Sequence, residues 1–151
     1  MIQFFVPFRL RNLSNMRGHW TVRHRYSRQL RGLTATLGRE ACRGLEIDPC
    51  TPKHIRFIAY VTRRFDDDGL QAALKPCRDG LQLPRAAEMG GGVGCFGRRT
   101  IRAAQVGCGI IQSDGIKSGH EFEYRQEIAR DRGHGGVFVT IEWTKSERAE
   151  G

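Results

Sequence analysis

The stretch HIRFIAYVTRRFDDDGLQAALKPCRDGL, residues 54–81, contains the change of hydrophobic period that decides the fold. Its first part alternates apolar and more polar residues, which predicts a strand with one buried face made of Ile55, Phe57, Ala59 and Val61. Its second part repeats apolar residues at steps of three and four, which predicts a buried helical face made of Leu70, Leu74, Cys77 and Leu81. Asp66, Asp67 and Asp68 therefore lie where a strand leads into a helix.

Two further elements are predicted before this stretch. Residues 2–6 form a short apolar run closed by Pro7, which suits a first strand. Residues 20–45 have the helical spacing of one buried face, made of Val22, Tyr26, Leu30, Leu33, Leu37 and Ala41.

Within residues 70–81, Pro76 removes a backbone donor and crowds the preceding turn, so we expect a kink or an early end of that helix.

The second half of the chain is less regular. Residues 83–105 combine glycines and arginines without a sustained period, which predicts a flexible basic loop. VGCGII, residues 106–111, predicts a short strand, and two alternating runs around 122–128 and 137–143 predict an antiparallel hairpin. The expected fold is mixed α/β (α+β), with a small mixed sheet of about four to five strands packed with two main helices. Residues 1–143 are expected to be one domain, followed by a polar tail at 144–151.

The charge of the chain points to a polyanionic partner. The 151 residues include 25 Lys+Arg and 16 Asp+Glu, giving a formal net charge of +9. Nucleic acid is the leading candidate, ahead of a membrane surface. Residues 9–43 contain nine arginines and a single acid, Glu40. A solvated helix face usually mixes its charges, because like charges oppose helix formation, so this region favours phosphate contact.

Several classes of protein are disfavoured. The five cysteines form no close ligand pair, which favours a reduced cytosolic chain and argues against a structural zinc site. No signal peptide or membrane span is recognisable, so we expect a soluble protein in the cytoplasm. Gly92, Gly94 and Gly97 match G-x-G-x-x-G, but no Rossmann-type strand precedes them and no P-loop lysine follows, so no nucleotide cofactor is expected.

The acidic cluster admits two interpretations. An aspartate at the start of a helix caps its amides, and we expect Asp67 to have this role. Capping does not explain three adjacent carboxylates, which repel one another unless a cation or a guanidinium relieves them. Asp66 and Asp68, two apart at the end of a strand, are expected to point to the same side and to bind Mg²⁺ or Mn²⁺.

Three more residues are candidates for the same site. Asp114 follows the predicted strand 106–111 and is a possible third ligand, although Asp-Gly is also an ordinary turn signal. Lys75 and Asp79 are four apart on the predicted helix, which suits either a surface ion pair or a lysine placed over a scissile phosphate.

Four segments together resemble the RusA-type Holliday-junction resolvases, small homodimeric endonucleases common in phages and prophages. The segments are VPFRLRNLSNMRGHW, FDDDGLQAALKPCRDGL, GCGIIQSDG and GVFVTIEW, and they extend over most of the chain. The family motif is Asp-x-Asp-Asn, followed by a lysine and then an aspartate. Here Gly69 stands in place of the Asn and Ala72 in place of the lysine, and Lys75 follows three residues later, nearly one helical turn.

The resemblance implies a Mg²⁺-dependent endodeoxyribonuclease that nicks four-way DNA junctions in recombination and repair, as a homodimer in the cytoplasm of a bacterium or of a phage's host. Asp66, Asp68 and Asp114 would bind the metal, Lys75 would assist catalysis, and Asp67 and Asp79 would support the site. Phosphate contacts are expected from arginines of the first helix region and of the glycine-rich loop: Arg17, Arg23, Arg25, Arg28, Arg31, Arg98, Arg99 and Arg102.

Two other interpretations are open. The chain could be a RusA-like DNA-binding module without catalysis, whose acids only cap a helix. It could also be a small basic RNA-binding protein, which the charge permits, although no RNA-recognition signature is present and the acids would be unexplained.

Overall fold

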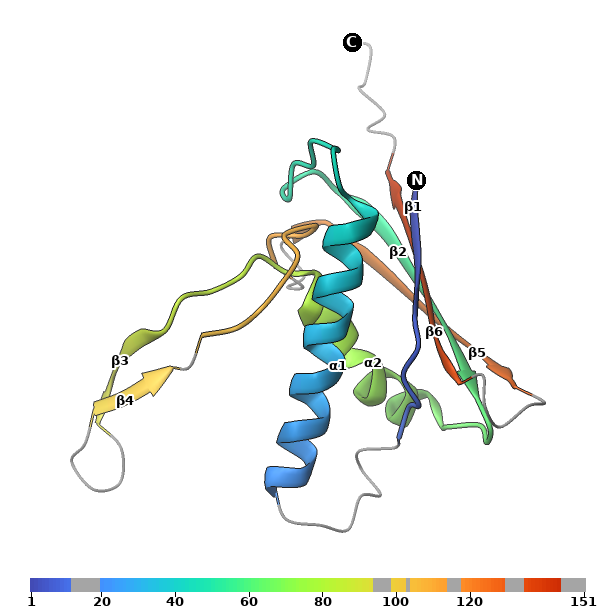
Figure 1. Cartoon of the computed structure of the whole chain (residues 1–151), viewed down its shortest axis with the longest axis horizontal. Helices are drawn as coiled ribbons and strands as arrows, with labels where there is room; N and C mark the ends of the chain where they lie inside the picture. The colour runs from blue at the N-terminus through green and yellow to red at the C-terminus, as the bar shows by residue number, and fades with distance from the viewer. Residues whose placement is uncertain (12–19, 94–98, 103, 114–117, 130–134, 145–151) are drawn as a thin grey trace.

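The main body of the chain is a four-stranded mixed sheet covered on one face by two helices. The computed structural model describes residues 1–11, 20–93, 99–102, 104–113, 118–129 and 135–144. The strand order is β1 (Ile2–Val6), β6 (Gly136–Trp143), β2 (Lys53–Val61) and β5 (Glu121–Ile128). The helices α1 (Trp20–Ala41) and α2 (Asp67–Leu81) pack against each other on this face (Figure 1). The structure is thus the small mixed α/β fold that the sequence predicts.

The predicted switch from strand to helix at residues 54–81 is confirmed. In β2 every second residue is buried, with Ile55, Phe57, Ala59 and Val61 facing the helices. In α2 the predicted face of Leu70, Leu74, Cys77 and Leu81 is buried. Of the kink or early end expected at Pro76, the early end is wrong, because α2 continues to Leu81. Burial of the apolar side chains in the last turn offsets the backbone hydrogen bond that proline removes.

Helix α1 lies where the sequence predicts, but it ends at Ala41. Five of the six predicted core residues are buried or packed against the core: Tyr26, Leu30, Leu33, Leu37 and Ala41. Val22, predicted to be buried, is 49% exposed, whereas Thr34 and Gly38 are buried. The reason is the close contact between the helices. A Cβ atom added at Gly80 of α2 would lie 2.8 Å from the backbone oxygen of Arg31 in α1. Small residues at this contact fix which side of α1 faces inward.

The predicted hairpin between the last two strands is wrong. β2 lies between β5 and β6, and β5 runs parallel to β2, with Tyr124 beside Phe57. β6 is antiparallel to both β1 and β2, so that Val139 pairs with Phe4 on one side and Phe57 on the other. The strongly apolar β6 is placed inside the sheet, and the more polar β5 takes an edge, where fewer of its residues are buried.

Residues 83–105 contain a two-stranded antiparallel ribbon, β3 (Glu88–Val93) and β4 (Arg99–Arg102), where we predicted a loop. The ribbon extends away from the main body (Figure 1). Its glycine run and a register shift between Met89 and Val93 hide the usual alternation. The predicted strand 106–111 is reduced to an isolated bridge between Ile111 and Gln82. Gly107 permits this close approach, because a Cβ there would lie 2.0 Å from the backbone oxygen of Gln82.

Within the described ranges, no helix is both long enough and apolar enough to cross a bilayer. Of the predicted polar tail 144–151, the structure describes Thr144, whose backbone N–H donates to the oxygen of Pro52 at 3.2 Å. The remaining residues, 145–151, lie outside the described part of the chain.

Candidate functional site

The acidic cluster forms the start of α2. Asp66 is the N-cap: its backbone is extended, and its Oδ1 accepts a hydrogen bond from the Gly69 N–H at 3.1 Å. Asp67 and Asp68 are the first two residues of the helix, and all three side chains are exposed. The expectation that Asp67 caps the helix is therefore wrong. The strand-end geometry expected for Asp66 and Asp68 is also wrong, because β2 already ends at Val61.

The backbone just before the cluster is held in place by the edge strand β5. Gln126 accepts a hydrogen bond from the Phe65 N–H at 2.9 Å and donates its amide to the Phe65 oxygen at 2.8 Å. This double contact fixes the residue next to Asp66 and orients the entry into α2. Sequence reasoning missed Gln126, because it lies about sixty positions from the cluster and its only signal was a polar residue on a buried face.

The chemistry of these carboxylates suits a hard divalent cation. Mg²⁺ is usually bound through one or two carboxylates and keeps several waters, and the exposed acids offer such oxygens. Among the residues that the structure describes, no group of three potential ligands is close enough to hold a metal ion. The described carboxylates therefore do not form an all-protein cage for a metal ion.

The predicted third ligand, Asp114, lies outside the described residues. The described segment that precedes it is anchored at the far end of α2: the Ile111 N–H donates to the oxygen of Leu81 at 3.1 Å, and the Gln112 N–H donates to Pro49 at 3.1 Å. Along a helix that rises about 1.5 Å per residue, Leu81 is roughly 20 Å from the N-terminus of α2. The described residues thus do not bring this segment to Asp66.

Lys75 and Asp79 form the predicted ion pair, at 3.3 Å. The other oxygen of Asp79 accepts a 2.7 Å hydrogen bond from Arg31 of α1. The Asp79 carboxylate is only 14% exposed and the Arg31 guanidinium 22%, whereas Lys75 is 57% exposed. Asp79 therefore links the two helices, and Arg31, expected to contact phosphate, is already paired.

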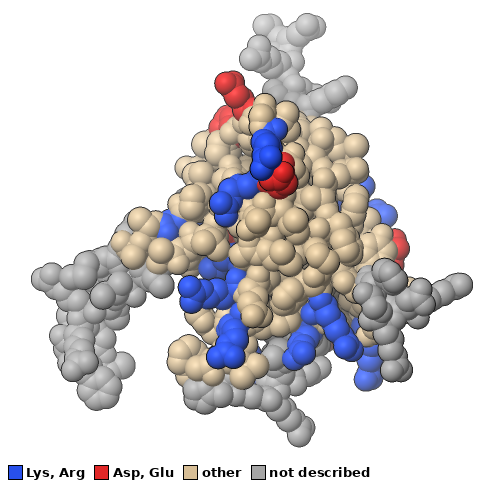
Figure 2. Space-filling model, viewed as in Figure 1, with Lys and Arg blue, Asp and Glu red and all other residues tan. Residues whose placement is uncertain are grey.

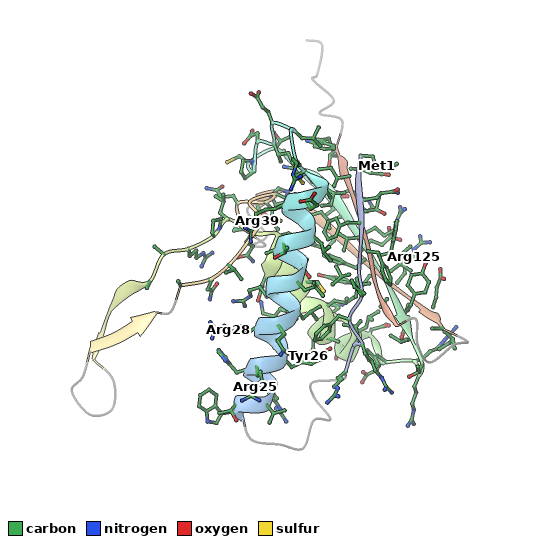
Figure 3. All side chains as sticks on the ribbon, in the orientation of Figure 1. Met1, Arg25, Tyr26, Arg28, Arg39 and Arg125 are labelled. Atoms are coloured by element: carbon green, nitrogen blue, oxygen red, sulfur yellow. The ribbon has the colours of Figure 1, made fainter. Side chains whose placement is uncertain are left out.

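The other predicted arginines divide between two places. Arg23, Arg25 and Arg28 are exposed on the first turns of α1, where Figure 3 labels Arg25 and Arg28. Arg99 and Arg102 lie at the two ends of β4, and Arg17 and Arg98 lie outside the described residues. In Figure 2 basic side chains dominate the lower half of the molecule, whereas the acidic ones lie mainly above it and at its right edge.

A hollow of about 280 Å³ lies between the end of β1 and the start of α1. Three arginines line it, Arg9, Arg11 and Arg25, with Tyr26 among its apolar walls. The Tyr26 hydroxyl accepts from the Arg11 N–H at 2.8 Å and donates to the Arg9 oxygen at 3.2 Å, which holds this segment against α1. Burial raises the pKa of Tyr26 to about 12, so the hydroxyl keeps the proton that it donates.

No carboxylate is among the described residues that line this hollow, so it suits an anion such as a phosphate group. Arg9 and Arg11 were not among the predicted DNA contacts. Their position next to Arg25 depends on the packing of the chain after β1 against α1, which the local sequence does not show.

The arginine-lined hollow and the acidic cluster both follow strands that end at the same side of the sheet, β1 and β2. Val6 and Ala59 both pair with Val137, so β1 and β2 run in the same direction and end at the same level. A Cβ built on Gly135 would lie 3.6 Å from the Tyr60 oxygen and 3.9 Å from the Arg9 Cα.

Cys77 and Cys108 are not activated nucleophiles. Burial raises the pKa of Cys77 to about 12 and that of Cys108 to about 11, which keeps both as thiols at neutral pH. Burial also lowers the pKa of His120, whose ring nitrogens have no hydrogen-bond partner within the described structure. Cys95 and His134 lie outside the described residues.

No protein-family model, curated protein or solved structure matches this chain.

Proposed function

We propose that the chain is a Mg²⁺-dependent endodeoxyribonuclease that acts on four-way DNA junctions. The observation that supports this most is that β1 and β2 end at the same level of the sheet, with the arginine-lined hollow after β1 and the exposed carboxylates of α2 after β2. A carboxylate cluster alone repels a phosphodiester, and an arginine cluster alone only binds it. The two together, with a cation, are what phosphodiester hydrolysis requires. The resemblance to RusA-type resolvases supplies the junction as substrate.

The residues of this chain would divide the work as follows. Asp66 and Asp68 would hold the cation, whereas Asp114, the further ligand that the resemblance implies, follows a segment held at the far end of α2 and is given no part in this site. When bound, Mg²⁺ would make a water more acidic and stabilise charge on the phosphate oxygens. Arg9, Arg11 and Arg25 would bind the neighbouring phosphates, and Gln126 would keep Asp66 correctly placed. Lys75 would reach the phosphate only by leaving Asp79, which keeps Arg31 as a partner.

Two symmetric nicks require two active sites, which a two-fold homodimer supplies. The reaction would take place in the cytoplasm of a bacterium or of a phage-infected host, in recombination and repair. Binding would depend strongly on salt, because arginine–phosphate contacts release counterions from the DNA.

The test is cleavage of a synthetic four-way junction and of a matched linear duplex, each with Mg²⁺ and with chelator. We expect Mg²⁺-dependent nicks in the junction, loss of nicking in Asp68→Asn, and retained binding by that variant. Arg25→Gln is the matched binding variant: it should weaken junction binding and lower the salt slope by about one. Junction that is bound but never cut, at any Mg²⁺ or Mn²⁺ concentration, would refute the nuclease.

A second candidate function is junction binding without cleavage. It is favoured by the capping role of Asp66 and by the attachment of residues 111–112 to the far end of α2. It predicts that Asp68→Asn and the wild type bind junctions equally and that neither cuts them.

A further inference from the structure

The hollow between β1 and α1 is larger than a phosphate group needs. Its volume of about 280 Å³ is close to the lower limit of roughly 300 Å³ for small-ligand sites. A water molecule takes up about 30 Å³ in the liquid, and a phosphate group is only a few times larger than water. A phosphate held by the arginines would therefore leave room for a further part of the same ligand.

The walls of the hollow show what that further part would be. Besides the arginines, it is lined by Phe8, Val22, Tyr26 and the amide side chain of Gln29. The rings of Phe8 and Tyr26 pack edge to face, with centroids 5.0 Å apart and an angle of 61° between them. Val22, predicted to lie in the core, is 49% exposed at this place. Aromatic and apolar walls beside one hydrogen-bonding amide suit a planar heterocycle better than a second anion.

The aromatic wall is preformed. The Phe8 N–H donates to the Val6 oxygen at 2.9 Å, which closes a tight turn around Pro7. The Tyr26 hydroxyl is held by its two hydrogen bonds to the backbone after β1. Both rings thus keep their positions when a ligand enters, and little conformational entropy is lost on binding.

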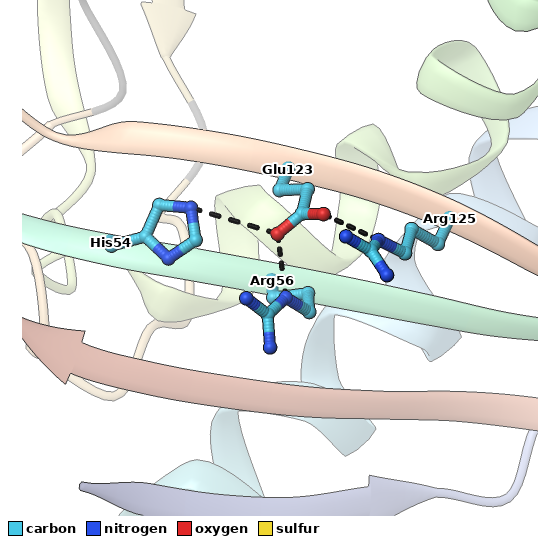
Figure 4. A network of polar contacts seen from close by, with 4 residues as sticks. All are labelled: His54, Arg56, Glu123 and Arg125. Atoms are coloured by element: carbon cyan, nitrogen blue, oxygen red, sulfur yellow. Dashed lines mark hydrogen bonds and ion pairs between the residues drawn. The ribbon is translucent and has the colours of Figure 1, made fainter.

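The arginines of the hollow differ from those on the helix-free face of the sheet. There, Arg56 and Arg125 are both bonded to Glu123, which neutralises them within the chain (Figure 4). Around the hollow, the described lining residues include three arginines and no carboxylate. A phosphate is the counter-ion that such a site suits best.

A concave site restricts which nucleotide can enter. A paired base is stacked on both faces, so it reaches a hollow only after it has left the stack, whereas an unpaired base is already free. Arg25 and the exposed Arg28 continue the basic surface along α1, which suits a strand with several phosphates better than one phosphorylated side chain (Figure 3). We infer that the hollow binds an unpaired nucleotide of a nucleic-acid strand, with the base against Phe8, Val22 and Tyr26 and the phosphate at the arginines.

This inference extends the nucleic-acid binding of the proposed function, but it does not depend on cleavage. A protein that binds junctions without cutting them could use the same hollow. The site would direct the chain to places where base pairing is interrupted, such as the centre of a junction, a bulge or a strand end.

The test measures binding of the full chain to three DNA probes by fluorescence anisotropy, in the presence of chelator. One duplex contains a single bulged nucleotide, the second has an abasic residue at the bulge, and the third is the matched duplex without a bulge. The two bulged probes have the same phosphates, so the difference between their affinities reports the base. We expect the bulge with a base to bind at least about tenfold more tightly than the abasic one, as for a base stacked on an aromatic side chain.

Three variants and a control separate the base from the phosphate. Phe8→Leu keeps an apolar side chain but loses the flat ring, and Val22→Ser loses an apolar wall, so each should reduce the preference for the base at least about threefold. Arg11→Gln should weaken binding to both bulged probes equally and leave the preference unchanged. Val106→Ser is the matched control, because Val106 is also 49% exposed but does not line the hollow, and it should bind like the wild type.

Equal affinity of the wild type for the two bulged probes would overturn the inference. Full preference for the base in Phe8→Leu and Val22→Ser, with native circular dichroism, would do the same. A phosphotyrosine peptide that displaces the bulged probe at a lower concentration than unlabelled bulged DNA would assign the hollow to a protein partner instead. Junction nicking with Mg²⁺ is measured separately, and its absence in a chain that prefers the unpaired base would refute the nuclease alone.

Discussion

Replacing Asp66 by Asn and by Ala separates helix capping from metal binding, which the same carboxylate combines. The Oδ1 atom of Asp66 accepts the Gly69 N–H at 3.1 Å. Asparagine keeps an oxygen at this position and caps helices about as well as aspartate, but it carries no charge. Alanine removes the oxygen, and such losses cost about 1 kcal/mol of stability.

The expected stabilities follow from this contact. The free energy of unfolding of Asp66→Asn should lie within about 0.5 kcal/mol of the wild-type value. The substitution relieves repulsion from Asp67 and Asp68, which offsets the weaker interaction with the helix dipole. Asp66→Ala should lose about 1 kcal/mol, which for a chain of this size lowers the melting temperature by roughly 2–4 °C. Urea denaturation monitored by circular dichroism measures both.

The expected activities follow a different order. If Asp66 binds the cation, Asn and Ala should both reduce Mg²⁺-dependent junction nicking by at least about a hundredfold, whatever their stabilities. Asp67→Asn is the matched control at the next position and should retain most of the activity. Wild-type nicking by Asp66→Asn would show that the carboxylate only caps the helix. An Ala variant as stable as the wild type would show that it does not cap.

Three further predictions concern stability and are checked by urea denaturation. Asp79→Ala should lower the free energy of unfolding by about 2 kcal/mol, since it leaves the largely buried guanidinium of Arg31 unpaired. Lys75→Ala should lower it by under about 0.5 kcal/mol, and equal losses would contradict the assigned roles. Gly80→Ala should cost about 1–3 kcal/mol, because its Cβ would lie 2.8 Å from a backbone oxygen of α1, while Gly32→Ala, with open space around it, should stabilise the chain by up to about 1 kcal/mol. The pKa of His120 is lowered from 6.5, so the unfolded chain takes up this proton first as the pH falls. The free energy of unfolding should thus decrease below about pH 6.5, and His120→Gln should remove that decrease relative to the wild type.

The elements that the sequence predicted well are those in which one regular face is buried, because that face gives a clear hydrophobic period. β2 and α2 each bury one regular face, so Phe57 and Leu74 could be assigned to the core without knowledge of their partners. Helix α1 was also predicted, with Tyr26 and Leu30 in the core, but the burial of Thr34 was missed because it depends on the close approach of Gly80 on another helix. The pairing of β5 with β2 was missed because adjacency in sequence favours a hairpin, whereas the choice of partner depends on burial across the whole sheet.

The candidate site shows the same division. The sequence indicated the acids at a strand-to-helix junction, because a run of three aspartates is visible locally. It gave no indication that Gln126 would bind the backbone of Phe65, or that Arg9 and Arg11 would meet Arg25 around a common hollow. These contacts join residues far apart in the chain, and each depends on the packing of a loop against a distant element.

The position of β6 has a consequence for how the chain folds. β6 joins β1 to β2, so Ile2 finds its partner Ile141 only when nearly the whole described chain has been synthesised. During translation at about 5–20 residues per second, the apolar β1 stays unpaired for at least several seconds. The sheet can therefore be completed only after β6 has been synthesised. Because the strands that pair are so distant in sequence, the chain should fold slowly for its length.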